Sequence, residues 1–271
     1  MLPLPKIGSV QCTFGSFEPE QLHLVAFDLD GTLVESKQKL DPAMAQALQE
    51  LLSRFDVAII SGAKFAQFTS QILDWLQLPA DAHPLHLLPT CGSQYYRLTP
   101  NSISEVYVKN LDAALLQRAV NLVEETARQM GLWHDNPWGE IIENRGTQVT
   151  FSALGQQAPG DAKAAWDPSG EKRQSLAAAL AVKLPQLQVK VGGSTSIDIT
   201  AKGIDKAFGM RALMKHLGLM PREVVFLGDR FDEYGNDRVV LETDIAAQCV
   251  TGWRQTAEFI DDLLRLESGG V

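Results

Sequence analysis

The stretch Val25-Ala26-Phe27-Asp28-Leu29-Asp30-Gly31-Thr32-Leu33 decides the fold of this chain. It begins as a short apolar run, typical of a buried strand, and ends in two acids one residue apart. Because alternate strand residues point the same way, Asp28 and Asp30 should start on one side, at the sheet edge where open α/β folds bind ligands. Such close carboxylates need a cation, a shared proton or a positively charged ligand nearby. A phosphate ester brought in with Mg²⁺ fits that need.

Further motifs follow this stretch in a fixed order. They are Ile59-Ile60-Ser61-Gly62, which ends a second apolar run, Gly203-Ile204-Asp205-Lys206, and a third apolar run ending at Gly228-Asp229 before Gly235-Asn236-Asp237. Together they resemble the signature of the haloacid dehalogenase (HAD) superfamily, which is mostly phosphatases and phosphotransferases. The resemblance runs from about residue 24 to about residue 260. It implies a Mg²⁺-dependent enzyme with an aspartyl-phosphate intermediate.

Composition fits a globular enzyme, with 45% apolar and 21% charged residues among 271. The net charge of −9 argues against nucleic-acid and anionic-membrane partners, and no stretch is apolar enough for a signal peptide or a membrane span. Cys12, Cys91 and Cys249 are widely spaced, which fits thiols in a reducing compartment better than a disulfide framework. We therefore expect a cytoplasmic protein whose partner is a small phosphorylated metabolite.

Strand and helix patterns alternate, which predicts an α/β fold, a doubly wound parallel sheet with an inserted α+β cap domain. Core strands are expected at 23–28, 57–60, 85–88, 224–227 and 245–250, with helices from Asp41-Pro42 and over 65–76, 205–217 and 256–266. Cap strands are expected at 105–108, 141–143, 147–151 and 189–191, helices at 112–130 and 172–184, and a mobile loop over 155–170. The predicted domains are a discontinuous HAD Rossmann-like core, 1–95 and 199–271, with an irregular arm over 1–22, and a cap, 96–198. This arrangement resembles the family's type IIB, and a homodimer through the cap is compatible with it.

The core motifs supply the predicted catalytic residues. Asp28 is the nucleophile, Asp30 the general acid/base, and Lys206 neutralises charge on Asp28 and the transferring group. Lys202 is a rival for the lysine, but its spacing from the following helix is less suitable. Phosphate-binding groups are expected from Gly31, Thr32, Ser61 and Gly62. Ser61 alone has an ordinary alternative role as a helix N-cap.

The acids of the first and last motifs form the predicted Mg²⁺ site. Asp28 and Asp229 are the expected carboxylate ligands, and the backbone carbonyl of Asp30 completes the protein set, because Mg²⁺ takes few carboxylates and keeps several waters. Asp237 is expected to bind through water or to orient the other ligands, with Asn236 in support.

The spacing of the last motif narrows the resemblance to phosphomannomutases of the eukaryotic type. Six residues separate Gly228-Asp229 from Asn236-Asp237, and Ile142–Gly146 and Gly192-Gly193 before Ser196-Ile197-Asp198 agree with the same family. By this resemblance, Arg145 grips a distal phosphate, while Ser196 and Asp198 hold sugar hydroxyls. A structural salt bridge is the alternative role of Arg145.

Departures from that family favour hydrolysis. Gln156 and Lys163 stand where the family has further phosphate-binding arginines, and Pro89-Thr90-Cys91-Gly92 replaces Pro-Glu-Asn-Gly. Lys163 still offers substrate a point charge, but it lacks the guanidinium fork. We predict a phosphatase of a small phosphorylated metabolite such as a sugar phosphate, with a phosphomannomutase-type phosphohexose mutase as the alternative. A non-catalytic phosphosugar-binding module is disfavoured, because every charged catalytic position is present.

Overall fold

A computed structural model describes residues 12–233 and 235–268. The chain forms two compact units, one made of Met1–Val108 and Asp205–Val271 and the other of Lys109–Ile204. We call them the core unit and the cap unit. Their boundaries differ from the predicted cap limits of 96 and 198, because residues 96–108 continue the sheet of the core unit.

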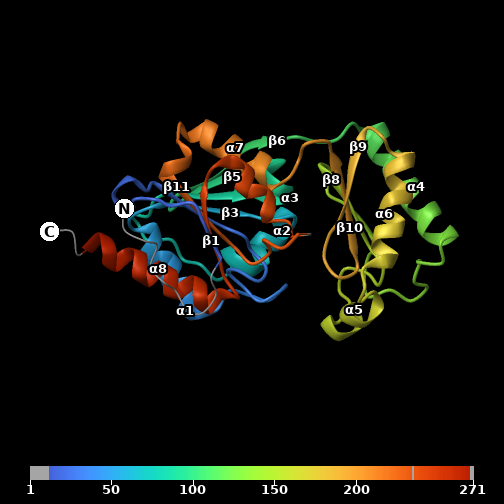
Figure 1. Cartoon of the computed structure of the whole chain (residues 1–271), viewed down its shortest axis with the longest axis horizontal. Helices are drawn as coiled ribbons and strands as arrows, with labels where there is room; N and C mark the ends of the chain where they lie inside the picture. Colours follow the sequence, from blue (N-terminus) through green and yellow to red (C-terminus); the bar gives the residue numbers. More distant parts are fainter. Residues whose placement is uncertain (1–11, 234, 269–271) are drawn as a thin grey trace. The chain divides into compact units, whose positions relative to one another are not determined.

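The core unit contains a mixed sheet with a parallel centre (Figure 1). Its strands are β1 (Thr13–Phe14), β2 (Leu24–Phe27), β3 (Asp56–Ile60), β4 (Leu85–Leu88), β5 (Gln94–Thr99), β6 (Ser102–Val108), β11 (Val224–Gly228) and β12 (Ala246–Cys249). The eight strands lie in the order β1-β12-β11-β2-β3-β4-β5-β6. The pairs from β12 to β4 are parallel, whereas β1, β5 and β6 pair antiparallel at the two edges. The predicted doubly wound α/β class is confirmed.

Helices cover both faces of this sheet, as Figure 1 shows. The core-unit helices are α1 (Pro42–Leu52), α2 (Phe65–Phe68), α3 (Pro89–Gly92), α7 (Lys206–Leu217), α8 (Trp253–Ser268) and the short η1 (Pro19–Gln21), η2 (Thr69–Leu73), η3 (Pro221–Glu223) and η4 (Arg238–Thr243). Val25 and Phe27 of β2 pack in the cluster that holds α1 and α8 residues, while Leu24 and Ala26 pack in the cluster on the α7 side. Strands buried on both faces read as continuous apolar runs, which is why they were visible in the sequence.

The helix predicted over 65–76 is interrupted by a change of helix type. The α-helical turns of α2 end at Phe68, and η2 is a π-helix in which the N–H of Asp74 donates to the carbonyl of Thr69 (2.9 Å). Such π-turns are rare and occur mostly at functional sites. Periodicity alone cannot reveal them, since one wider turn barely shifts an apolar pattern.

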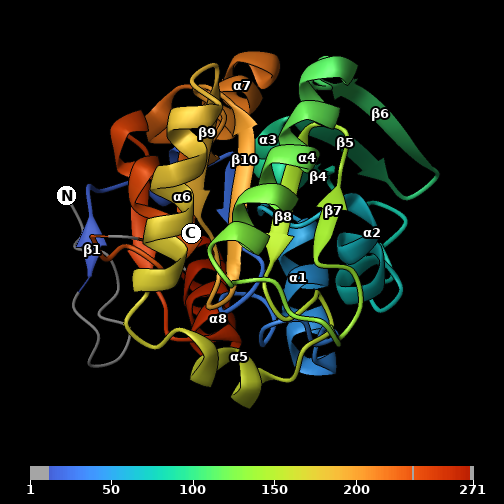
Figure 2. The same ribbon diagram turned by 90° about the vertical axis from the view of Figure 1, so that its right-hand side faces the viewer.

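The cap unit is a four-stranded antiparallel sheet with helices on one face (Figure 2). Its elements are α4 (Ala113–Gln129), β7 (Ile142–Asn144), β8 (Gln148–Ser152), α5 (Gly160–Trp166), α6 (Glu171–Lys183), β9 (Leu187–Val191) and β10 (Ser196–Ala201). Val149 and Ile197 face α4 and α6 in one apolar cluster, so the alternate residues of β8 and β10 face the opposite side. The loop predicted over 155–170 is corrected, because it contains α5.

Two of the cysteines are bonded, which corrects the expectation that all are thiols. Cys12 and Cys249 form a disulfide with a Cα–Cα distance of 5.2 Å across a separation of 237 residues, and Cys91 retains its thiol. The antiparallel pairing of β1 with β12 brings the two residues together. Of the arm predicted over 1–22, residues 1–11 lie outside the described residues, and β1 and η1 lie within the remainder.

Among the helices of the described residues, none combines the length and the apolar character needed to span a membrane.

Candidate active site

The core motifs meet at the carboxyl edge of the parallel sheet. Asp28 follows β2, Asp229 follows β11 and Ser61 follows β3, and these strands are parallel neighbours. The N–H of Asp28 donates to the carbonyl of Leu227 (2.9 Å), which continues the pairing of β2 with β11. Three motifs distant in sequence are therefore adjacent at the edge where open α/β sheets bind ligands.

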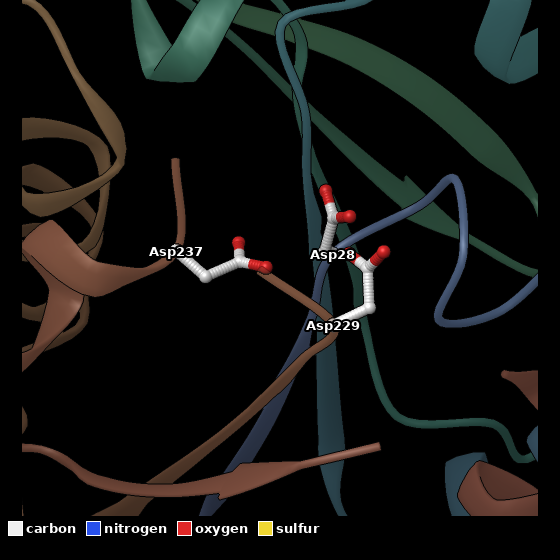
Figure 3. A group of neighbouring side chains, drawn as sticks. All are labelled: Asp28, Asp229 and Asp237. Carbon is white, nitrogen blue, oxygen red and sulfur yellow. The ribbon is translucent and has the colours of Figure 1, made fainter. Parts of the chain in front are cut away.

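Asp28, Asp229 and Asp237 form one acidic group (Figure 3). One carboxylate oxygen from each lies within 4.8 Å of the others, and Figure 3 shows Asp237 pointing toward the neighbouring carboxylates of Asp28 and Asp229. Burial raises the pKa of Asp28 well above its usual range against the opposing effect of Lys206. Burial and the charge of Asp237 likewise raise the pKa of Asp229. Concentrated negative charge of this kind requires positive charge beside it.

Lys206, the first residue of α7, supplies part of that positive charge. Its buried ammonium donates to Asp28 Oδ1 and to Asp237 Oδ1 (2.5 Å). Burial acts to lower the pKa of Lys206, but the charges of Asp237 and Asp28 outweigh it and raise this pKa. The Lys206 side chain therefore bridges two of the acids. Lys202, the rival position, is exposed.

Asp237 has both carboxylate oxygens in use. Oδ1 accepts from Lys206, and Oδ2 accepts from the N–H of Arg230 (2.9 Å). This arrangement suits a residue that orients Lys206 and the loop after β11, and the two roles of Asp237 at the metal site stay predictions. Asn236, predicted to support it, is exposed, and its role stays a prediction.

The donors of the acidic group fit Mg²⁺, which prefers carboxylate and carbonyl oxygens. Asp229 Oδ1 is buried and has no hydrogen-bond partner among the described residues, so a cation would satisfy it. Gly31 has a φ of +87°, and a Cβ at this position would collide with Asp229 Oδ2. The absence of a side chain at Gly31 therefore leaves room for the Asp229 carboxylate. Asp28, Asp229 and the carbonyl of Asp30 remain the predicted ligands.

The predicted phosphate-binding hydroxyls of Thr32 and Ser61 are buried. Thr32 lies four residues after Asp28, and Ser61 follows β3, the strand that pairs with β2. Thr32 Oγ1 has no hydrogen-bond partner among the described residues, while the Thr32 carbonyl accepts from Thr256 Oγ1 (2.7 Å). Ser61 Oγ accepts from the N–H of Ala63 (3.2 Å), so it stabilises its own turn and keeps a hydroxyl hydrogen for a second partner. Gly62 follows in the same turn, and its role in phosphate binding stays a prediction.

A left-handed turn after β4 supports the helix that carries Lys206. Thr90, Cys91 and Gly92 have φ angles of 48°, 56° and 80°, and the N–H of Cys91 donates to the carbonyl of Ser61 (2.8 Å). A Cβ on Gly209 of α7 would lie 2.9 Å from the Cys91 carbonyl oxygen, so α7 packs directly on this turn. Consecutive strained residues of this kind persist where surrounding structure fixes them, often at functional sites. The sequence of this turn departs from Pro-Glu-Asn-Gly, but that departure does not by itself indicate a supporting role for α7.

In the cap unit, Glu143, Thr150 and Asp198 are register neighbours across β7, β8 and β10. Asp198 Oδ1 accepts from Gln148 Nε2 (2.7 Å) and Thr150 Oγ1 (2.8 Å), and burial raises the pKa of Asp198. Arg145 donates to Glu143 Oε2 through Nε (2.8 Å) and a terminal nitrogen (2.6 Å), and both side chains are 8% exposed. The predicted phosphate clamp is therefore ion-paired within its own sheet.

The remaining predicted cap residues have partners from the cap backbone. Ser196 Oγ accepts from the N–H of Gly193 (2.8 Å), and Lys163 Nζ donates to the carbonyl of Gln156 (3.2 Å). Two residues that sequence reasoning missed hold the same turn as Ser196. Arg173 donates to the Gly193 carbonyl (2.5 Å) and pairs with the buried Asp167 (2.9 Å). Asp167 lies just before α6 and Arg173 lies in its first turn, and a hydrophilic helix start gives no sign of such a contact.

Solved structures share this fold at low sequence identity. A haloacid dehalogenase-like hydrolase from Bacteroides thetaiotaomicron matches with a TM-score of 0.58 and 16% identity, covering 89% of this chain and 99% of that one. An IMP-bound, N-terminally truncated IMP-nucleotidase of Plasmodium falciparum matches with a TM-score of 0.67 and 15% identity, covering 91% of this chain and 69% of that one. The fold and the ordered motifs define a HAD-superfamily enzyme, of phosphatase or mutase type.

Sequence comparison identifies the family to which the chain belongs within this superfamily. The family model described as eukaryotic phosphomannomutase matches residues 44–266, and the chain belongs to this family. A probable phosphomannomutase of Caenorhabditis elegans is 25% identical over 258 residues, covering 89% of this chain and 95% of the relative. Human phosphomannomutase 1 is 24% identical over 195 residues, covering 70% and 73%. The predicted resemblance to HAD enzymes and to phosphomannomutases is confirmed.

Proposed function

We propose that the protein is a Mg²⁺-dependent phosphatase of a small phosphorylated metabolite, with a sugar phosphate favoured. The observation that carries the proposal is the group at the end of β2 and β11, where Lys206 bridges Asp28 and Asp237 beside Asp229. HAD enzymes generally use Mg²⁺, and the buried, unsatisfied oxygen of Asp229 supports a cation at this point.

The proposed reaction divides hydrolysis into two displacements at phosphorus. In the first, a carboxylate oxygen of Asp28 bonds to phosphorus, the ester P–O bond breaks, and the leaving oxygen takes a proton from Asp30. In the second, water gives a proton to Asp30 while its oxygen bonds to phosphorus, and the bond to Asp28 breaks. Asp28 and the protonated Asp30 are restored, and inorganic phosphate leaves.

The charged neighbours of Asp28 prepare it for this role. Lys206 contacts the proposed nucleophile and lies where negative charge grows as phosphoryl oxygens approach. Asp237 keeps the lysine in place. Mg²⁺, held by Asp28, Asp229 and the Asp30 carbonyl, would supply further positive charge to the phosphoryl oxygens when bound. The hydroxyls of Thr32 and Ser61 are available to hydrogen-bond the same oxygens.

The cap residues favour hydrolysis over transfer within one sugar. A mutase must hold a second phosphate, and the guanidinium of Arg145 is instead paired with Glu143. Gln156 has no charge, and Lys163 is a single ammonium bonded to a backbone carbonyl. Each missing charge-assisted contact is worth about 1.5–3 kcal/mol, so two could weaken bisphosphate binding by two or more orders of magnitude. Ser196 and Asp198 stay the residues that we propose to hold sugar hydroxyls.

A phosphohexose mutase is the second candidate. The observation in its favour is the family match over residues 44–266, which includes the predicted cap residues. A screen of phosphorylated metabolites, scored for free phosphate and for isomerised product, tests both candidates. We expect phosphate from at least one sugar or polyol monophosphate. If no metabolite yields either free phosphate or an isomerised product, the proposal that the chain is a phosphotransferase is contradicted.

A further inference from the structure

The carboxylate of Asp30 is held by hydrogen bonds to both of its oxygens. Oδ1 accepts from the backbone N–H of Lys37 (2.6 Å) and from Gln71 Nε2 (3.1 Å), and Oδ2 accepts from Gln67 Nε2 (3.1 Å). A half-buried aspartate bound on a single oxygen could still rotate about its side-chain bonds. Donors on both oxygens select one orientation.

Gln71 is fixed as a donor by its surroundings. Its side chain is buried, its Nε2 also donates to the carbonyl of Gln38 (3.0 Å), and its Oε1 has no hydrogen-bond partner among the described residues. Turning the amide over would place Oε1 against the oxygens of Asp30 and Gln38 and would lose both bonds. The Gln71 carbonyl accepts from the N–H of Leu40 (2.8 Å), so this residue connects the helical segment to the loop after Asp30.

The helical backbone places both glutamines toward the same acid. Gln67 lies in α2 and Gln71 lies four residues later in the π-helix η2, so the pair spans the change of helix type. Residues four apart are neighbours on one helix face. Burying Gln71 Oε1 without a hydrogen-bond partner destabilises the folded state, and an apolar side chain would avoid this loss. A glutamine at this position therefore points to a functional reason for its amide.

We propose that Gln67 and Gln71 are positioning residues for Asp30, holding its carboxylate in the orientation from which it serves the leaving oxygen. They act through Asp30 and not on the substrate. The inference rests on the proposed function, in which Asp30 protonates the leaving group. It predicts a loss that depends on the leaving group, because a poor leaving group needs the proton and a good one does not.

The experiment measures kcat/KM for phosphate monoesters ranging from p-nitrophenyl phosphate to alkyl phosphates. The variants are Gln71→Leu and the half-buried Gln67→Met, with Asp30→Asn as reference and Gln49→Met as matched control. Gln49 is a core-unit helix glutamine whose side chain donates to the carbonyl of Gln77 (2.8 Å). The kcat/KM ratio covers phosphoryl transfer to Asp28, so it reports the step in which the leaving group departs.

We expect both glutamine variants to lower kcat/KM by roughly tenfold for alkyl phosphates and by less than about threefold for p-nitrophenyl phosphate. A tenfold loss is only part of what a general acid contributes, because the variants misplace Asp30 and do not remove it. Asp30→Asn should show the same pattern more strongly, and Gln49→Met should show none. An equal loss for all esters, or no loss, would overturn the inference. If Gln71→Leu does not fold, Gln67→Met still decides the outcome.

A second readout separates this inference from the proposed function. If the wild-type protein hydrolyses neither these esters nor any of the screened metabolites, the proposed function fails, but the contact is still measurable by thermal unfolding. Asp30→Ala and Gln67→Met should then shift the Tm non-additively when combined, because each removes the same interaction. Additive shifts would show that Gln67 does not hold Asp30.

Discussion

Arg145 donates to Glu143 from a distance of 2.6 Å, and both side chains of this ion pair are 8% exposed. A buried guanidinium that already has a carboxylate partner must lose it, or share it, to bind a phosphate. The pair therefore bears directly on whether the cap of this enzyme can grip a second anionic group. The sequence is compatible with two roles for Arg145, a phosphate clamp and a structural salt bridge, and the observed contact favours the second.

Glu143→Gln should release Arg145 and strengthen the binding of ligands with a second phosphate. We expect inhibition by a hexose bisphosphate to tighten about tenfold, equivalent to roughly 1.4 kcal/mol, with little change for small monophosphates. Glu140→Gln is the matched control, since it removes the same charge from an exposed position in the cap. Inhibition constants settle the point. Equal tightening in both variants would reflect net charge alone and not this ion pair.

Asp28→Asn should abolish turnover while the protein stays folded. The side chains are nearly isosteric, and loss of the nucleophile should raise the barrier by about 5 kcal/mol or more. The substitution also removes one of three crowded acids, so the Tm without Mg²⁺ should be unchanged or higher. Phosphate release and thermal unfolding are the measurements. Turnover near the wild-type rate would remove Asp28 from the mechanism.

Mg²⁺ should stabilise the core unit as well as support activity. Ligands that bind the folded state raise Tm by mass action, so added Mg²⁺ should raise the wild-type Tm and chelation should reverse the rise and stop turnover. Asp229→Ala should lose most of this response. Asp232→Ala, at an exposed acid of the same loop, should keep it. The proposed ligands would be contradicted if added Mg²⁺ left the wild-type Tm unchanged, or if it raised the Tm of Asp229→Ala as much as that of the wild type.

The stability of the core unit should fall in acid through Asp56. Burial acts to raise the pKa of Asp56, but hydrogen bonds from His86 and His83 (each 3.1 Å) outweigh it and lower this pKa. A lowered folded-state pKa stabilises the fold above the unfolded value, about 3.9, and that stability is lost as pH falls through the folded value. Urea unfolding below about pH 5 should therefore show a steeper loss for wild type than for Asp56→Asn. Parallel pH profiles would contradict this origin.

The parts of the fold that could be predicted from sequence are those with a local signature. β2, β3, β4 and β11 are buried on both faces, so each is mostly apolar and is followed by motif residues. β5 and β6 are partly exposed, and their assignment to the core sheet depends on pairing that no local pattern encodes. The disulfide of Cys12 with Cys249 depends on the same kind of long-range pairing.

The candidate site also contains residues with a local sequence signature and residues whose contacts depend on distant parts of the chain. Asp28, Lys206 and Asp229 could be predicted, because motif chemistry and strand ends define their places. The partners that orient them could not be, since they come from other elements. Gln67 and Gln71 reach Asp30 from a helical segment. Arg145 lies in the turn after β7, and its spacing from Glu143 does not by itself show that the two side chains pair.

The central claim, hydrolysis in preference to transfer between two hydroxyls of one sugar, is tested most directly by paired rates on the wild-type enzyme. The measurement follows phosphate release and conversion of mannose 1-phosphate to mannose 6-phosphate in the same reaction, with Mg²⁺ and a hexose bisphosphate activator present. We predict that phosphate release exceeds isomerisation, because Arg145 is paired with Glu143 and Lys163 is the remaining cation among the predicted cap ligands. Isomerisation that far outpaces phosphate release would contradict this account and establish the mutase.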